Sequence, residues 1–228
     1  MMDAFIIGFL ISLVVVLYAF HKEALNTSGS FSALIVGTLI YGFGGWASYV
    51  PLMLFFIPAS FIAFTDTEDE GRSARQVIAK SIIGLFFTVL FFFLEDSIWL
   101  LFMTASFAGA AADTWSSIIG KTFGGTTRRL PTFKKVDKGT PGGVSLYGFL
   151  IPLVVSLFFG LFHFVFYGAL LMILLIAGIG TLNSLIDSLL NTLRHKEVAK
   201  DRFKWLAYID SAFMNFLSNA LTMFVLSL

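Results

Sequence analysis

The sequence predicts an all-α protein, a polytopic bundle of about eight transmembrane helices. Of its 228 residues, 57% are hydrophobic and 13% are charged, and the mean hydropathy is +0.89. Soluble domains carry roughly a quarter charged residues, so a membrane protein is the leading class. The apolar residues form runs near the length of about 20 residues that a helix needs to cross the hydrocarbon core. The charged residues collect between those runs.

Eight apolar runs are candidates for membrane-spanning helices, because a chain in lipid must satisfy its backbone hydrogen bonds within the helix. The first run has no basic region before it and no clear cleavage site after it, so it is interpreted as a retained helix and not a signal peptide. The second run is short and ends at Gly44 and Gly45. The runs cover approximately residues 4–20, 29–44, 46–64, 77–94, 97–119, 144–164, 167–191 and 206–227.

The connectors between these runs predict the orientation of the bundle. Four connectors hold all of the 15 Lys and Arg residues except Lys80, which begins a helix leaving the same side. The opposite turns hold only Glu95 and Asp96 as charges. By the positive-inside rule the four connectors are cytoplasmic and both termini lie outside. If the second run lay in the membrane interface instead, only Lys22 would change sides. The connectors are residues 21–28, 65–76, 120–143 and 192–205.

No internal repeat or low-complexity linker is evident, so residues 1–228 are expected to form one membrane domain with a cytoplasmic loop at 120–143. The net charge of +1 gives no reason to expect a nucleic-acid partner. The absence of cysteine excludes disulfides, thiolate metal sites and cysteine nucleophiles.

Three carboxylates, Asp113, Asp187 and Asp210, lie well inside predicted spans and near their cytoplasmic ends. A charge at a helix centre costs about 2.5–3.5 kcal/mol on insertion scales, so some interaction should compensate each of them. For Asp210, a position that simply faces water at a helix end is an equal alternative. Asp113 follows the run of small residues 105–112, which would let a neighbouring helix approach closely.

The surroundings of two of these carboxylates favour a hard metal ion. Hydroxyls follow Asp113 at Thr114, Ser116 and Ser117, and Asp187 shares a helical face with polar neighbours by its spacing of three and four. Carboxylates and hydroxyls, with no cysteine or nearby histidine, suit Mg²⁺ rather than zinc. This hypothesis requires that the helices at 97–119 and 167–191 are neighbours. The polar neighbours of Asp187 are Asn183, Ser184 and Ser188.

The connector at 120–143 joins basic residues to repeated glycines and threonines. Glycines let backbone amides close around an anion, hydroxyls donate to phosphate oxygens, and Lys or Arg neutralise the charge. The next helix, expected just after Gly142 and Gly143, would add its positive end. A solvated positive-inside loop explains the sign of the charge, but not the repeated Gly and Thr. The GxxxxGK[ST] spacing of a Walker loop is missing.

Several segments resemble the integral-membrane family that contains plant phytyl-phosphate kinase, and the likeness covers most of the chain. More distantly, the chain is similar to the CTP-using enzymes dolichol kinase and phosphatidate cytidylyltransferase. Two positions depart from the family pattern: Ile118 stands where an acidic residue is usual, and Asn191 where a glycine is usual. The segments are residues 28–37, 71–77, 112–117 with Gly120, 133–136, 138–145, 184–190 and Asn215.

The resemblance implies CTP as phosphoryl donor, Mg²⁺ as cofactor and an isoprenoid monophosphate in the membrane as acceptor. Asp113 and Asp187 would be metal ligands, and Lys135 and Lys138 would screen charge between donor and acceptor, with Asp113, Lys135 and Lys138 as the catalytic residues. The expected nucleotide- and phosphate-binding residues are Ser116, Ser117, Lys121, Thr132, Lys134, Gly139, Thr140, Gly142, Gly143, Asn183 and Ser184.

Two other functions fit the sequence. A membrane cytidylyltransferase would use the same donor and metal but release pyrophosphate. A small-molecule or lipid transporter would be expected to place ionisable groups near the midplane and to show paired broken helices. Pro51, Pro58 and Pro152 do interrupt spans, although the carboxylates gather at one end. The expected location is the cell membrane, with the active site on the cytoplasmic side, and self-association is left open.

Overall fold

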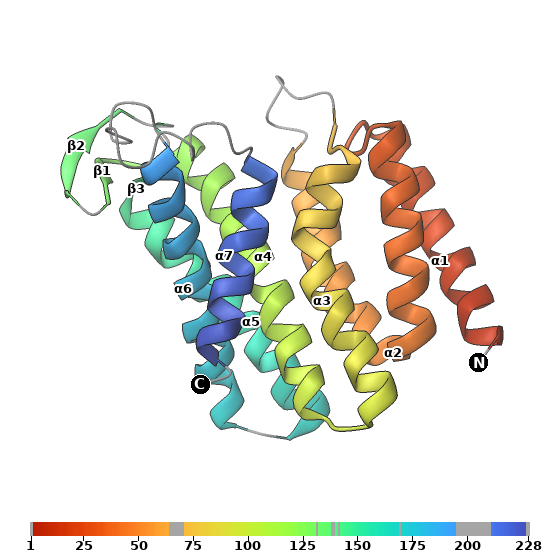
Figure 1. Cartoon of the computed structure of the whole chain (residues 1–228). Helices are drawn as coiled ribbons and strands as arrows, with labels where there is room; N and C mark the ends of the chain where they lie inside the picture. Colours follow the sequence, from red (N-terminus) through yellow and green to blue (C-terminus); the bar gives the residue numbers. More distant parts are fainter. Residues whose placement is uncertain are drawn as a thin grey trace. The chain divides into compact units, whose positions relative to one another are not determined.

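The computed structural model describes residues 2–63, 71–130, 132–137, 140, 142–168, 170–194 and 211–226. This part of the chain is mostly helical and contains one small sheet (Figure 1). The helical class predicted from composition is confirmed. The elements are α1 (Met2–His21), α2 (Thr27–Ala63), α3 (Ala74–Leu94), α4 (Ile98–Phe123), β1 (Thr127–Arg129), β2 (Lys134–Val136), β3 (Gly143–Val144), α5 (Leu146–Tyr167), α6 (Leu171–Arg194) and α7 (Ser211–Leu226).

Five of the described helices are long and apolar enough to cross a membrane: α1, α2, α3, α5 and α6. Their outward faces carry large apolar side chains, such as Val14, Phe86 and Val165, which suit contact with lipid. The eight-span count and the predicted orientation stay predictions, because these five are recognised by length and composition alone.

The predicted helices at 29–44 and 46–64 form one element, α2, which is broken at Gly45. Gly45 has φ 57° and ψ −150°, a conformation that is essentially restricted to glycine. Across the break, the Tyr49 ring lies 5.5 Å from the Tyr41 ring, and its hydroxyl is 3.0 Å from Ser12 Oγ, which adjoins Gly37. In one straight helix, residues 37 and 49 would be about 18 Å apart. The chain therefore folds back on itself at Gly45.

Contacts between Cα atoms divide the chain into two compact units, Met1–Phe107 and Ala108–Leu228. Unit 1 contains α1, α2, α3 and the start of α4, with aromatic packing at its centre. The Phe107 ring stacks at 6.4 Å from Phe55 and presses against Gly84, where a larger residue would not fit. The single-domain organisation stays a prediction.

Unit 2 is built on the paired helices α5 and α6. Gly160 of α5 lies against the backbone of Ile173, and Gly180 of α6 lies against Ser156, so the absence of side chains lets the two helices pack closely. Helix α7 joins them through a hydrogen bond of 3.3 Å from Thr222 Oγ1 to Asn183 Oδ1. Helix α5 ends in a C-cap at Gly168, whose φ of 74° gives the left-handed conformation.

The connector at 120–143 differs from the expected glycine-rich loop. Helix α4 continues through Gly120 to Phe123, and a three-stranded antiparallel sheet of order β2-β1-β3 follows. The β-branched residues Thr127, Val136 and Val144 favour strands. The strands are only two or three residues long, which is too short for an alternating pattern to be recognised in the sequence. Helix α5 begins later than expected, at Leu146, because Ser145 caps it by accepting a hydrogen bond from Gly148 N.

Gly45→Ala should lower the free energy of unfolding by about 1–3 kcal/mol, because alanine is strained at this φ and ψ. The added methyl group meets no atom within 4 Å, so the effect comes from the backbone alone. Gly178→Ala is the matched control, because it too adds a methyl group in open space, but on an ordinary helical backbone. Thermal unfolding in detergent should show a lower Tm for the first variant only. Equal effects would contradict the role assigned to Gly45.

Candidate functional site

Helices α4 and α6 approach closely in unit 2, as the run of small residues predicts. A Cβ on Gly109 would lie 2.9 Å from Asn183 Nδ2, so only glycine fits there. Ala108, Ala111 and Ala112 are completely buried around it. Small residues let helix backbones approach in a membrane protein. The two helices are therefore neighbours, which is the condition that the magnesium hypothesis required.

The side chains of Ser116 on α4 and Ser184 on α6 meet, with 3.0 Å between their Oγ atoms. Asp113 lies one turn before Ser116, and Asp187 lies one turn after Ser184, each about 4.5 Å along its own helix. Each carboxylate residue is only 6% exposed. Ser116 Oγ also donates to the backbone oxygen of Asp113 at 3.0 Å. Two buried carboxylates thus flank one pair of buried hydroxyls.

Asn191 orients the Asp187 carboxylate. Its Nδ2 donates to Asp187 Oδ2 at 2.8 Å and to the Asp187 backbone oxygen at 3.0 Å. The other carboxylate oxygen, Oδ1, is buried as well. Sequence reasoning noted Asn191 only as a departure from a family pattern and missed this contact. The signal was its position four residues after Asp187, on the same helical face.

Asn183 has a clear structural part in the site. It is 2% exposed, its amide packs on Gly109, and its Oδ1 accepts from Thr222 on α7. Three helices of unit 2 therefore meet at this side chain. Its expected contact with phosphate stays a prediction.

The sheet places four basic side chains in directly opposed positions. Arg128 pairs with Lys135, and Arg129 pairs with Lys134, in the antiparallel register of β1 and β2. Opposed side chains in such a pair have Cβ atoms about 4.5–5.5 Å apart, and like charges there are destabilising. An anion placed beside either pair would relieve the repulsion. Arg128 also donates from Nη1 to the backbone oxygen of Phe133 at 3.0 Å, which orients its guanidinium.

The sheet is attached to α6 next to the carboxylate. The completely buried Thr192 donates from Oγ1 to the backbone oxygens of Gly142, at 3.3 Å, and Ser188, at 3.0 Å. Gly142 has φ 75° and lies directly against Thr192, so a side chain there would clash. Thr192 is five residues after Asp187, about 7.5 Å along the helix. The basic sheet and the Asp187 carboxylate therefore belong to one end of unit 2.

The remaining residues predicted for the site fall in three groups. Ser117, Thr132, Lys134 and Lys135 are exposed, and Gly143 pairs with Arg129 in the sheet. Thr140 directs its own hydroxyl to the Asp137 backbone oxygen at 2.7 Å. Lys138, Gly139 and Asp210 lie outside the described residues, as does the side chain of Lys121.

The donor set at the α4 and α6 contact fits a magnesium ion. Buried carboxylates and hydroxyls are hard oxygen ligands, and Mg²⁺ is commonly held by one or two carboxylates, with water and substrate phosphates as its other ligands. The described part of the chain contains no group of three or more His, Cys, Asp or Glu residues arranged for a metal. A site of two aspartates completed by phosphate oxygens is consistent with that result.

These features define an integral membrane protein with a polar end on unit 2 that carries opposed basic residues. The chain belongs to the integral membrane protein family DUF92, whose model matches residues 10–223. The resemblance to a family containing plant phytyl-phosphate kinase is thereby confirmed. No solved structure matches the chain.

Three relatives illustrate the range of the family. An uncharacterized membrane protein of Methanocaldococcus jannaschii, MJ0933, is 29% identical over 196 residues, which cover 82% of each chain. Protein VTE6, chloroplastic, of Arabidopsis thaliana is 32% identical over 150 residues, 59% of this chain and 45% of that protein. Protein PGR of the same plant is 28% identical and covers 98% of this chain and 95% of its own.

The contact between α4 and α6 can be tested by cross-linking, because the chain has no cysteine of its own. The double variant Ser116→Cys/Ser184→Cys should oxidise readily to a disulfide, since the two Oγ atoms are 3.0 Å apart. Ser117→Cys/Ser184→Cys should stay reduced, because residue 117 is exposed and lies on another face of α4. Intact mass after alkylation of free thiols distinguishes the two. Equal cross-linking would contradict the packing.

Lys135→Gln should make the sheet more rigid when no anion is bound, because it removes one member of a pair of opposed cations. The expected gain is about 0.2–1 kcal/mol. Hydrogen exchange of the amides in residues 127–136 should slow in the variant. Inorganic phosphate should slow exchange in the unaltered protein but have less effect on the variant. Identical exchange with and without phosphate in both proteins would exclude an anion site at this pair.

Proposed function

We propose that the protein is a magnesium-dependent phosphotransferase, which uses CTP to convert an isoprenoid monophosphate to the diphosphate at the cytoplasmic face of the cell membrane. The main support is one observation: two buried carboxylates flank a hydroxyl pair on neighbouring helices, and a sheet of opposed cations is attached beside one of them. Such a combination suits a substrate that is both highly anionic and metal-bound. The resemblance to a family that contains plant phytyl-phosphate kinase supports the same class.

The cation pairs explain how the protein can attract two phosphorylated substrates. A nucleotide triphosphate and a lipid monophosphate repel each other, and positive side chains held between them lower that repulsion. Lys134 and Lys135 are exposed on β2, opposite Arg129 and Arg128. In this proposal they contact the nucleotide phosphates, together with Lys121, Thr132, Lys138, Gly139 and Thr140. Ser116, Ser117, Gly142, Gly143, Asn183 and Ser184 complete the predicted set.

The two buried carboxylates are the reason for proposing magnesium as the metal. Asp113 and Asp187 would hold Mg²⁺, which would neutralise charge on the phosphate oxygens. Ser116 and Ser184 keep the two helices together at the level of the carboxylates. Asn191 holds one oxygen of Asp187 in place, so the carboxylate is oriented before a substrate arrives.

The reaction needs little help from a general base. An acceptor phosphate monoester is already ionised near neutral pH, so its oxygen can attack the γ-phosphorus of CTP directly. A new bond forms between that oxygen and phosphorus, the bond from phosphorus to the β-γ bridging oxygen breaks, and CDP leaves. In phosphoryl transfer the protein contributes mainly position and charge stabilisation. The absence of an obvious base in the predicted site is consistent with that chemistry.

The reaction is tested with the purified full chain in lipid, CTP, Mg²⁺ and prenyl monophosphates of several lengths. The expected products are a prenyl diphosphate and CDP in equal amounts. Release of pyrophosphate with a CMP-bearing lipid would identify a cytidylyltransferase instead. Formation of neither product with any chain length would refute the proposal.

Asp113→Asn should lower kcat by at least about 100-fold, because a lost metal ligand removes several kcal/mol of charge stabilisation. Asp137→Asn is the matched control, since Asp137 is exposed and uses only its backbone oxygen in the hydrogen bonds from Thr140. Its kcat should stay within about twofold. Steady-state rates of CDP release check both variants, and an unchanged Tm shows that each is folded. Full activity of Asp113→Asn would exclude its role.

A further inference from the structure

The hairpin formed by β1 and β2 carries an exposed aromatic side chain at its tip. Phe133 lies in the turn, directly before β2, and is 61% exposed. Its backbone has φ 53°, in the left-handed region where a side chain crowds the carbonyl oxygen. Glycine would adopt this conformation without that strain. The turn itself therefore does not account for an aromatic residue at this position.

Hydrogen bonds within the hairpin fix the backbone of Phe133. Its N–H donates to the Arg129 backbone oxygen at 2.7 Å, and its own backbone oxygen accepts from Arg128 Nη1 at 3.0 Å. Thr132 Oγ1 also donates to the Arg129 oxygen, at 3.3 Å. The tip is thus held by the protein before anything contacts it.

The sheet begins at the edge of the hydrocarbon layer. β3 ends at Val144, and α5 starts two residues later at Leu146, which is 69% exposed. Helix α5 is a candidate membrane span, and its 22 residues extend about 33 Å, close to the hydrocarbon thickness of about 30 Å. A crossing therefore needs the whole of α5, which leaves Leu146 at the boundary and β3 in the headgroup layer.

Helix α6 gives the same depth independently. It is a candidate span that begins at Leu171, and Thr192 lies about 32 Å further along it. Thr192 Oγ1 donates to the backbone oxygen of Gly142, which directly precedes β3. Figure 1 shows the sheet beside the ends of both helices. Two spans thus place the sheet at the level of the lipid headgroups.

The hairpin combines the aromatic ring with cations. Arg128, Lys134 and Lys135 are all exposed on it. A guanidinium has several N–H donors, and the bond to Phe133 uses one nitrogen of Arg128, so the others can reach a phosphate oxygen. A single exposed apolar residue is ordinary on a protein surface. An aromatic ring beside cations at headgroup depth is typical of segments that bind anionic membranes.

We propose that the tip of this hairpin rests on the bilayer, with the Phe133 ring in the interface and Arg128 on the headgroup phosphate of an anionic diacyl phospholipid. The interface removes the apolar ring from water, and the guanidinium neutralises the charge of the headgroup. Because Lys134 and Lys135 follow Phe133 directly, this contact also holds them close to the membrane surface.

The inference goes beyond the proposed reaction and does not depend on it. The proposed reaction requires neither Phe133 nor Arg128. The lipid is a phosphodiester of the surrounding bilayer, whereas the proposed acceptor is a phosphate monoester. The contact also needs neither nucleotide nor metal.

The contact is tested with the full chain in nanodiscs, where the lack of native cysteine allows a fluorophore to be attached at one site. The environment-sensitive fluorophore nitrobenzoxadiazole on Thr132→Cys reports on the tip, because Thr132 is exposed and precedes Phe133. Adding phosphatidylglycerol to phosphatidylcholine nanodiscs should shift its emission to the blue and raise its intensity at least about twofold. An unchanged emission would overturn the proposal.

Phe133→Gly, made in the labelled protein, separates the ring from the turn. Glycine suits the φ of 53°, so the hairpin should fold at least as well, whereas the response to phosphatidylglycerol should be lost. Arg128→Gln should need about fivefold more phosphatidylglycerol for the same response, since it removes one cation near the surface. A full response in Phe133→Gly would overturn the proposal.

Two variants are matched controls for the ring and for the charge. Phe93→Ala removes an exposed ring from α3, and Lys22→Gln removes an exposed cation that follows α1. Both should keep the response within about twofold of the unaltered protein, because neither residue belongs to the hairpin. Equal losses in Lys22→Gln and Arg128→Gln would show only a general attraction to anionic lipid and would overturn the proposal.

Inorganic phosphate distinguishes a lipid surface from a site for a free anion. In phosphatidylcholine nanodiscs, phosphate should leave the emission unchanged. A blue shift equal to that with phosphatidylglycerol would assign Arg128 to a soluble phosphate and would overturn the proposal. Diphosphate synthesis by the unaltered chain without the fluorescence response would refute the contact alone, whereas the response without synthesis would refute the proposed reaction alone.

Discussion

The candidate site depends on the close approach of α4 and α6. Glycine at position 109 leaves room for Asn183, and the alanines around it keep the two backbones near each other. Once the helices are this close, Ser116 and Ser184 meet and each carboxylate lies within one turn of that contact. In a membrane, helices gain little from the hydrophobic effect when they pair, so packing and hydrogen bonds of this kind decide which faces meet.

The small sheet places basic side chains at the same end of unit 2 as this contact. A flexible loop would let its basic side chains spread apart, whereas the register of β1 and β2 holds Arg128 opposite Lys135 and Arg129 opposite Lys134. The hydrogen bond from Thr192 to Gly142 then fixes the sheet to α6. Like charges in opposed positions repel, and in the proposed function a phosphate beside them would lower that repulsion.

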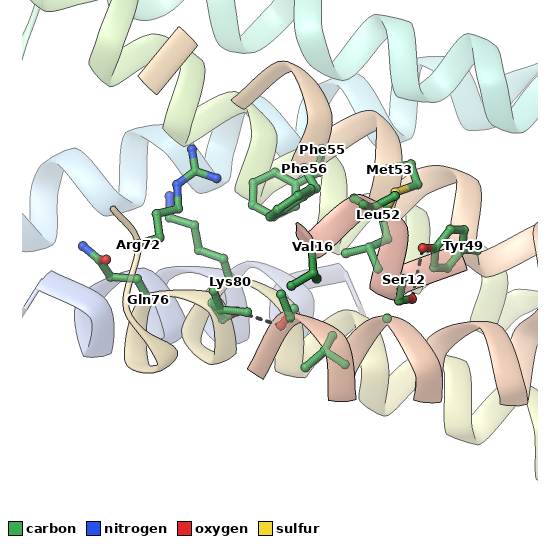
Figure 2. A pocket seen from close by; sticks show the side chains of 16 residues that line it. Ser12, Val16, Tyr49, Leu52, Met53, Phe55, Phe56, Arg72, Gln76 and Lys80 are labelled. Carbon is green, nitrogen blue, oxygen red and sulfur yellow. Dashed lines mark hydrogen bonds between the residues drawn. The ribbon is translucent and has the colours of Figure 1, made fainter. Parts of the chain in front are cut away.

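Both units place charge within an apolar frame, but they do so differently. Unit 2 combines buried carboxylates with a cationic sheet, as suits a metal and a polyphosphate. In unit 1, Arg72 and Lys80 line one pocket together with buried apolar side chains of α1 and α2 (Figure 2). Charged groups are costly in a membrane helix, so interactions with polar neighbours should compensate them.

The sequence by itself predicted most of the described helices and the burial of Asp113 and Asp187. The run at 77–94 corresponds to Ala74–Leu94, and the small residues before Asp113 predicted close helix packing. These features follow from local hydrogen bonding and hydropathy, which a linear pattern records. The tertiary structure decided the reversal at Gly45, the sheet, the hydrogen bond from Asn191 to Asp187 and the contact of Ser116 with Ser184. The first three lie within short stretches of the chain, but they depend on backbone and side-chain geometry that a hydropathy pattern does not record. Ser116 and Ser184 are 68 residues apart in the chain, and only packing brings such residues together.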